Sequence, residues 1–337
     1  MANRRRFLLG LAATALPGRA ALGQALEPVS FGTNWVAQAE HGGFYQAVAD
    51  GTYRAHGLEV TVVPGGPQVN NRLLLAAGRL DFYMGGNMIQ AFAAVDQNVP
   101  TTVVAALFQK EPQVLIAHPG QGIESFADLK RLPTIFISQA GVATFWQWMK
   151  AEHGFRDEQL KPYTFNAQPF LADKRSAMQG YLTSEPYAIE RSAGFTPKVF
   201  LLADQGFDPY GSTIEIRRAM LTERASTVQR FVEASIIGWY NYVYGDNSAA
   251  NGLIKRANPD MDDGKIAYAL ARMREHGIVD SGDSLTLGIG TVTEARVKGF
   301  FDKLVKSGIA RPTLDWRQAF DPRFVNRGLG RELRKAL

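Results

Sequence analysis

Short apolar segments alternate with amphipathic segments along most of the chain after residue 28. The segment 58–63 (LEVTVV) places Leu58, Val60 and Val62 on one face, as in a half-buried strand. Strands are predicted over 29–33, 58–63, 80–86 and 101–108, with helices over 42–54, 68–78 and 87–97. This order predicts an α/β fold with a doubly wound sheet that is covered by helices on both faces.

The same alternation restarts at residue 113 and predicts a second α/β lobe. After residue 221 the pattern becomes almost wholly helical, and the helix within 226–246 carries one apolar stripe. We therefore expect two lobes with a helical C-terminal part, lobe 1 being residues 26–112 and 206–337 and lobe 2 residues 113–205. Strands of the second lobe are predicted over 113–119, 134–138, 161–166, 181–184 and 198–204, helices over 142–153, 171–179, 263–276 and 293–306, and the stripe consists of Val228, Phe231, Val232, Ser235, Ile236 and Trp239.

The first 25 residues have the layout of a signal peptide. A basic start precedes an apolar run over 7–16, and small residues follow near 21–25. Arg5 and Arg6 before Phe7 resemble a twin-arginine signal. We expect residues 1–25 to be removed on export to the periplasm. No later apolar run reaches the ~20 residues that a membrane-spanning helix needs.

Composition excludes several classes of function. Without the four arginines of residues 1–25, 33 basic residues stand against 32 acidic ones, so the charge indicates no nucleic-acid partner. The absence of cysteine excludes disulfides, thiolate metal sites and a cysteine nucleophile. No two of the five histidines stand four residues apart, and no phosphate-loop, dinucleotide or nucleophile-elbow motif follows a strand. We expect no enzyme activity, no catalytic residue, no metal and no cofactor.

Candidate ligand-binding residues follow from the predicted topology, because open α/β sheets bind ligands beyond the carboxyl ends of their strands. Each candidate also has an explanation that involves no ligand. Trp35 could serve packing alone, the segment 138–144 could serve only as a helix cap, and Glu185 could serve only to complement a helix dipole. His41 alone is more typical of a structural histidine than of a base. The candidates are Asn34, Trp35, His41, Tyr45, Gln68, Tyr83, Asn87, Gln109, Gly141, Val142, Thr144, Glu185 and Tyr187.

Three segments resemble a known family: residues 31–66 (FGTNWVAQAEHGGFYQAVADGTYRAHGLEVTVVPGG), 73–86 (LLLAAGRLDFYMGG) and 181–190 (YLTSEPYAIE). They are similar to the periplasmic solute-binding proteins of ABC importers in the nitrate/sulfonate/taurine group, especially the branch grouped with thiamine-pyrimidine precursor proteins. Trp35, His41 and Tyr45 match the aromatic loop of that branch. The loop's Pro-Asn-x-Asn-His is replaced here by residues 37–41, so its amides are changed.

The resemblance implies a two-lobed type II periplasmic binding protein, a clamshell that closes on a small ligand and delivers it to an inner-membrane permease. It implies a monomer, hinges near 110–113 and 203–211, and a planar heterocyclic or aromatic solute like a pyrimidine. Trp35 and Tyr187 would stack on the ring, and Glu185 would accept from an N–H edge. The remaining polar candidates would donate or accept hydrogen bonds: Asn34, His41, Gln68, Asn87 and Thr144.

Three alternatives remain. A sulfonate-like or nitrate-like anion would instead bind the backbone N–H groups of residues 141–144. Relatives with this fold include a pyrimidine-forming synthase with a cysteine-rich iron motif. An exported enzyme of that kind is the second alternative, although this chain has no cysteine and so lacks the motif. An effector domain of a transcriptional regulator would need a DNA-binding helix pair at the N-terminus, where this chain has the signal-like segment.

Overall fold

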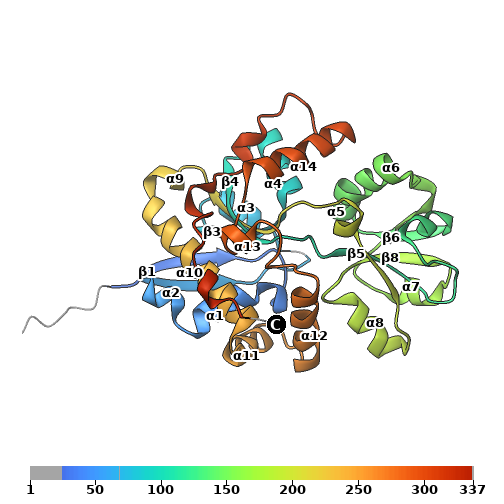
Figure 1. Cartoon of the computed structure of the whole chain (residues 1–337), viewed down its shortest axis with the longest axis horizontal. Helices are drawn as coiled ribbons and strands as arrows, with labels where there is room; N and C mark the ends of the chain where they lie inside the picture. The colour runs from blue at the N-terminus through green and yellow to red at the C-terminus, as the bar shows by residue number, and fades with distance from the viewer. Residues whose placement is uncertain (1–24, 68, 336–337) are drawn as a thin grey trace, which may run out of the picture.

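The computed structural model describes residues 25–67 and 69–335, and it shows two mixed β-sheets with helices packed around each (Figure 1). The first sheet has the order β2-β1-β3-β10-β4, and the second has the order β7-β6-β8-β5-β9. This confirms the predicted two-lobed α/β fold. The first sheet contains β1 (Glu27–Gly32), β2 (Leu58–Val63), β3 (Phe82–Asn87), β4 (Thr101–Phe108) and β10 (Gly211–Arg217), and the second contains β5 (Gln113–Ala117), β6 (Thr134–Ile137), β7 (Leu160–Pro162), β8 (Ser176–Tyr181) and β9 (Lys198–Leu201).

Most helices belong to the segments before β5 and after β9. These are α1 (Gly42–Ala49), α2 (Thr52–Ala55), α3 (Asn71–Ala76), α4 (Met88–Asp96), α9 (Met220–Glu223), α10 (Ala225–Tyr244), α11 (Ser248–Ala257), α12 (Asp263–Glu275), α13 (Ser284–Leu287) and α14 (Glu294–Lys306). The segment between β5 and β9 contains α5 (Gln139–Gly141), a π-helix η3 (Val142–Trp146), α6 (Gln147–His153), α7 (Gln168–Ala172) and α8 (Glu185–Ala193). The short 3₁₀ helices are η1 (Ala39–His41), η2 (Phe126–Arg131), η4 (Asp157–Gln159), η5 (Leu202–Gln205), η6 (Trp316–Ala319), η7 (Pro322–Phe324) and η8 (Arg331–Leu333).

The chain passes between the two sheets twice. It leaves the first sheet after Phe108 and enters the second at Gln113, then leaves the second after Leu201 and returns at Gly211. The predicted lobe boundaries at 112/113 and 205/206 fall within these crossings and stay a prediction. The predicted signal peptide, residues 1–25, lies outside the described residues except for Ala25.

Each crossing introduces an antiparallel strand. β10 runs antiparallel to β3 and β4, and β5 runs antiparallel to β8 and β9. The amino-terminal residue of β10, Gly211, therefore lies opposite the carboxyl-terminal residues Asn87 and Phe108. In the same way Gln113 lies opposite Tyr181. The edge of each sheet that carries the carboxyl ends of parallel strands thus also carries the start of one antiparallel strand.

The prediction was wrong for residues 171–184, where a helix and then a strand were expected. The structure has α7 ending at Ala172 and β8 running from Ser176 to Tyr181. The Asp173 side chain accepts from the Arg175 N–H at 2.9 Å, which closes a turn between them. β8 is a central strand buried on both faces, so it lacks the alternation that would have revealed it.

The predicted helix over 42–54 is interrupted at Gly51, whose φ of 79° lies in the left-handed region that favours glycine. It forms α1 and α2 instead of one helix. The apolar stripe of α10 is confirmed, because all six of its predicted members are buried. Within it, Phe231 stacks on Phe82 with 3.9 Å between ring centroids.

Helices α1 and α10 pack closely because glycines lie between them. A Cβ at Gly43 would overlap the Trp239 indole, and a Cβ at Gly238 would overlap the backbone of α1. Since α1 follows directly after η1 and the 34–41 loop, this contact fixes the position of that loop against lobe 1. No helix among residues 25–67 and 69–335 is both long and apolar enough to cross a membrane.

We predict that Gly43→Ala lowers the free energy of unfolding by about 1–3 kcal/mol, because the added methyl overpacks the contact with Trp239. Gly299→Ala is the matched control, since an added Cβ in the middle of α14 meets nothing within 4 Å. That control should gain about 0.5–1 kcal/mol from helix propensity. Urea unfolding of both variants measures the difference, and equal effects at the two positions would contradict the packing account.

Candidate functional site

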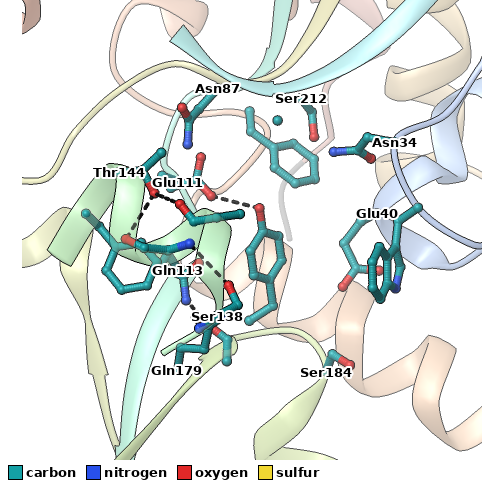
Figure 2. A pocket seen from close by; sticks show the side chains of 18 of the residues that line it. Asn34, Glu40, Asn87, Glu111, Gln113, Ser138, Thr144, Gln179, Ser184 and Ser212 are labelled. Carbon is teal, nitrogen blue, oxygen red and sulfur yellow. Dashed lines mark hydrogen bonds between the residues drawn. The ribbon is translucent and has the colours of Figure 1, made fainter. Parts of the chain in front are cut away.

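A cavity of about 240 Å³ lies where the edges of the two sheets meet. Its walls come from the 34–41 loop, the ends of β3 and β4 and the start of β10 in the first lobe, and from the start of β5, the segment 138–145 and the end of β8 in the second. Figure 2 shows these side chains converging on one space. The volume is that of a small-molecule site rather than of a macromolecular interface.

Three carboxylates line the cavity, and no lysine or arginine does among the described residues. Glu40 and Glu111 are almost fully buried. Burial raises the pKa of each of these two side chains to about 7, because the charged form loses its hydration. Burial also raises the pKa of the third carboxyl, Glu185. The cavity is therefore rich in hydrogen-bond acceptors and has no fixed positive charge to offset them.

Glu40 joins the two lobes. It lies on η1, and its Oε1 accepts a hydrogen bond from the Thr183 hydroxyl, which follows β8 in the second lobe. Burial is the main cause of its raised pKa; repulsion from Glu185 adds to it, and the Thr183 hydrogen bond partly offsets it. This contact holds the 34–41 loop against the second lobe in the conformation observed.

Glu185 begins α8, where it accepts a hydrogen bond from the Tyr181 backbone N–H at 2.7 Å. A carboxylate at this position also complements the helix dipole. Glu185 thus stabilises the start of α8, as its structural explanation expected, and its side chain also lines the cavity.

Glu111 lies on the crossing between β4 and β5. Its Oε1 accepts from the Tyr181 hydroxyl at 2.8 Å. The Asn87 side chain points toward the same carboxyl group in Figure 2 and lowers its pKa, as the Tyr181 hydroxyl does. Burial outweighs both effects. Oε2 has no partner in hydrogen-bond geometry among the residues described, although the Asn87 amide points toward this carboxyl group.

Aromatic rings form the apolar part of the wall. Trp35 of the first lobe contacts Phe165 of the second, with 5.0 Å between centroids and planes tilted by 45°. Phe165 in turn lies 5.4 Å from Tyr163. These rings offer a flat ligand an apolar surface on which to stack, since tilted and offset aromatic pairs are favourable. The other rings in the wall are Phe108, Phe145, Tyr181 and Phe207.

The helix start at residues 138–144 is a capped helix in this structure. The Ser138 N–H donates to Gln179 Oε1 at 2.6 Å, and the Gly141 N–H donates to Ser138 Oγ at 3.1 Å. The Val142 N–H donates to the Ser138 carbonyl at 2.9 Å. Within the segment 141–144, whose N–H groups an anion would need, Gly141 and Val142 therefore already donate to the protein.

His41 faces the cavity in an almost fully buried position. Burial lowers the pKa of its imidazole to about 3, so the ring is neutral at physiological pH. Its Nδ1 lacks a partner within the described part of the chain. A neutral imidazole can donate or accept one hydrogen bond, but it cannot balance the carboxylates by carrying charge. No cluster of three or more potential metal-binding side chains exists among the described residues.

Seven of the thirteen predicted residues line the cavity, and they come from both lobes. They are Asn34, Trp35, His41, Asn87, Gly141, Thr144 and Glu185. Gln68 lies outside the described residues. The remaining five do not line the cavity, and for each the structure gives a different role. They are Tyr45, Tyr83, Gln109, Val142 and Tyr187.

Alternation along β3 explains Tyr83. Met84 and Gly86 face the cavity, so Tyr83 points to the opposite face of the sheet. Tyr45 lies in the hydrophobic core of lobe 1. Gln109 is buried and donates to the carbonyls of Ala106 and Thr291.

The other two residues, Val142 and Tyr187, lie on helices and contact other side chains of the protein instead of the cavity. Val142 is partly buried and packs against the hydrophobic cluster that contains Phe145 and Trp146. Tyr187 contacts Tyr268 of α12 at 5.2 Å between centroids and accepts a hydrogen bond from Arg191 at 2.9 Å. It therefore joins α8 to α12 at the interface between the lobes and does not stack in the cavity.

Several cavity residues were not predicted, because the sequence reasoning considered only the carboxyl ends of strands. Glu111 precedes the antiparallel strand β5, Gln113 is its first residue, and Ser212 lies at the start of the antiparallel strand β10. Gln179 and Tyr181 lie on β8, which was predicted to be mostly helix. The acidic and aromatic character of residues 111–113 and 163–165 was the signal in the sequence that could have indicated these cavity residues. Their position could not be read without the strand directions.

The fold and cavity together are those of a two-lobed periplasmic binding protein. The family described as NMT1/THI5 like matches residues 38–248, and the chain belongs to this family. Over 113 residues the chain is 27% identical to 4-amino-5-hydroxymethyl-2-methylpyrimidine phosphate synthase of Schizosaccharomyces pombe, a match that covers 34% of this chain. The matched region spans only 32% of that curated relative.

Solved structures with the same fold include binding proteins and an enzyme. The periplasmic aliphatic sulphonate binding protein SsuA from Escherichia coli superposes with a TM-score of 0.62 at 15% identity, over 88% of this chain and 92% of that one. The desulfurization enzyme DSZB superposes with a TM-score of 0.58 at 15% identity, over 91% of this chain and 99% of that one. At these identities the likeness shows the fold alone.

The buried carboxylates predict an unusual pH dependence of stability. In the folded protein Glu111 has a pKa of about 7, whereas an unfolded glutamate has a pKa of about 4.3. The folded state therefore binds more protons between these values, and its stability falls as the pH rises through this window. Glu111→Gln removes that contribution, so the loss of unfolding free energy from pH 5 to pH 8 should shrink by about 2–3 kcal/mol.

Urea unfolding of the ligand-free protein at pH 5 and pH 8 measures this difference. Glu124→Gln, at an exposed position outside the cavity, is the control and should leave the difference unchanged. A Glu111→Gln variant with the same pH dependence as the parent would contradict the burial of an ionisable Glu111.

Proposed function

We propose that the protein is the extracytoplasmic solute-binding component of an ABC importer. It captures a small planar nitrogen heterocycle, of the pyrimidine or thiamine-precursor type, between its lobes and delivers it to a permease in the inner membrane. It works in the periplasm as a monomer after removal of a signal peptide, and it catalyses no reaction. Membership of the NMT1/THI5-like family and the two-lobed fold support this role.

One observation carries the choice of ligand. Three carboxylates face the cavity and no lysine or arginine does, within the described residues. A ligand that donates hydrogen bonds, such as an amino-substituted ring, satisfies these acceptors. An anion placed there would meet uncompensated like charge in a low-dielectric site, which is strongly unfavourable.

A sulfonate or similar anion is the second candidate, because the fold neighbour from Escherichia coli is named as a sulphonate binding protein. Its expected site is the helix start at 141–144. The N–H groups of Gly141 and Val142 already donate to Ser138 there, and Glu185 lines the same cavity. Both features favour the heterocycle over the anion.

An exported enzyme of pyrimidine-precursor synthesis is the third candidate, suggested by the printed name of the Schizosaccharomyces pombe relative and by the DSZB neighbour. That relative matches over about a third of this chain. The chain contains no cysteine, so it lacks the cysteine-rich iron motif that the family resemblance associates with such a synthase. The buried neutral His41 has no acidic hydrogen-bond partner among the residues described that would make it a base.

The lobes provide the mechanism of capture. The contacts between Trp35 and Phe165 and between Glu40 and Thr183 join side chains of opposite lobes across the cavity. A ligand that contacts both walls favours the closed form by its differential contacts, and rotation at the two crossings opens it again. The permease then receives the ligand from the opened cleft.

We predict that 4-amino-5-hydroxymethyl-2-methylpyrimidine binds the purified protein more tightly than methanesulfonate or benzenesulfonate. Trp35→Ala should weaken binding of the pyrimidine by roughly 30-fold, since it removes about 2 kcal/mol of stabilisation from aromatic burial. Isothermal titration calorimetry measures both effects. The control is Leu285→Ala, an exposed position outside the cavity, which should bind as the parent does. Tight sulfonate binding without pyrimidine binding would refute the proposal.

A further inference from the structure

Glu111 occupies a position that the other two cavity carboxylates do not share. It lies on the first crossing between the sheets, with 1% of its surface exposed. Tyr181 of the second lobe and Asn87 of the first both approach it (Figure 2). The start of β10 covers it from another side, because a Cβ at Gly211 would lie 2.9 Å from Glu111 Oε2.

The three carboxylates differ in how far the protein satisfies them. Glu40 accepts from the Thr183 hydroxyl, and Glu185 accepts from the Tyr181 N–H. Glu111 accepts from the Tyr181 hydroxyl at Oε1 only, and Oε2 is buried without a donor in the described part of the chain. A buried carboxylate oxygen without a donor is unfavourable, and a ligand group that supplies one recovers that free energy.

No positive charge of the protein is directed at this carboxyl group within the described residues. The neighbouring Lys110 forms an ion pair with Asp204 at 3.1 Å. Arg296, which reaches the same crossing, donates to the backbone carbonyl of Gln109. Tyr181 is the titratable group that contacts Glu111 directly, and the charges of Glu40 and Glu185 help to raise the pKa of the Tyr181 hydroxyl.

We propose that Glu111 anchors a positively charged nitrogen, an ammonium or amidinium group, on the ligand. This rests on the proposed function and specifies it: the solute is a planar ring that bears a basic arm directed toward the crossing. Oε2 accepts from the cationic N–H while Tyr181 holds Oε1 and fixes the plane of the carboxyl group. The 34–41 loop and Phe165 cover the ring, so ring and arm are recognised by different parts of the cavity.

Proton linkage follows from this arrangement. Burial raises the pKa of Glu111 to about 7, so near pH 7 the protonated and ionised forms of this carboxyl group coexist. A bound cation stabilises the ionised form and lowers that pKa, so binding releases a proton. The affinity for a cationic ligand should therefore fall as the pH decreases below 7.

Two pyrimidine probes that differ only in the arm test the proposal. They are 4-amino-5-aminomethyl-2-methylpyrimidine, whose arm is cationic at pH 8, and its neutral hydroxymethyl counterpart. Titration calorimetry at pH 8 should show that the parent prefers the aminomethyl probe by about 10- to 100-fold, the range of a hydrogen bond to a charged group. Glu111→Gln should reduce the preference, measured as the ratio of the two affinities in the same variant, to less than about 3-fold.

Glu124→Gln is the matched surface control and should retain the full preference. A second measurement needs no variant. Titration of the parent with the aminomethyl probe at pH 7 in two buffers of different ionisation enthalpy should show release of a fraction of a proton. No proton release, or the same release from Glu111→Gln, would overturn the assignment to Glu111.

Failure of this inference is distinguishable from failure of the proposed function. If both pyrimidines bind equally well to the parent, the heterocycle proposal stands and the cation anchor is wrong. If neither binds and benzenesulfonate does, the heterocycle proposal itself is wrong. If the preference for the aminomethyl probe survives in Glu111→Gln, another carboxylate binds the cationic arm, and the proposed role of Glu111 is wrong.

Discussion

The antiparallel entry of β5 and β10 is the constraint on which the rest of this structure depends. Because the chain crosses between the sheets twice and each crossing delivers a reversed strand, Gln113 lies opposite Tyr181 and Gly211 lies opposite Asn87. The crossings themselves are thereby drawn into the floor of the cavity. Glu111 is buried at this point as a direct result of chain connectivity. The crossings between the sheets and the cavity therefore share residues.

Burial of the acids then determines what the cavity can hold. Glu40 and Glu111 have pKa values raised to about 7 by burial, and lysine and arginine are absent from the described part of the wall. A donor-rich or cationic solute removes this electrostatic strain, and an anion increases it. Glu40 also bonds to Thr183 of the opposite lobe. We therefore propose that protonation, ligand binding and lobe contact are linked through the same few side chains.

The sequence predicted the fold better than the site. The strands 58–63 and 101–108 coincide with β2 and β4, because clear alternation or a bounded apolar run identifies them. β8 was missed, since a strand buried on both faces has no alternation. Trp35, Asn87 and Glu185 were placed in the cavity by the strand-end rule. Glu111 was not, because its partner Tyr181 is 70 residues away and no local pattern shows which strands run in reverse.

The most direct test of the account is the identity of the molecule that the protein carries. Mass spectrometry of the small molecule released on denaturing the protein, isolated from its own cells without added ligand, would provide it. The account predicts a planar nitrogen heterocycle with amino or other N–H groups. A sulfonate, nitrate or other anion released in stoichiometric amount would contradict it.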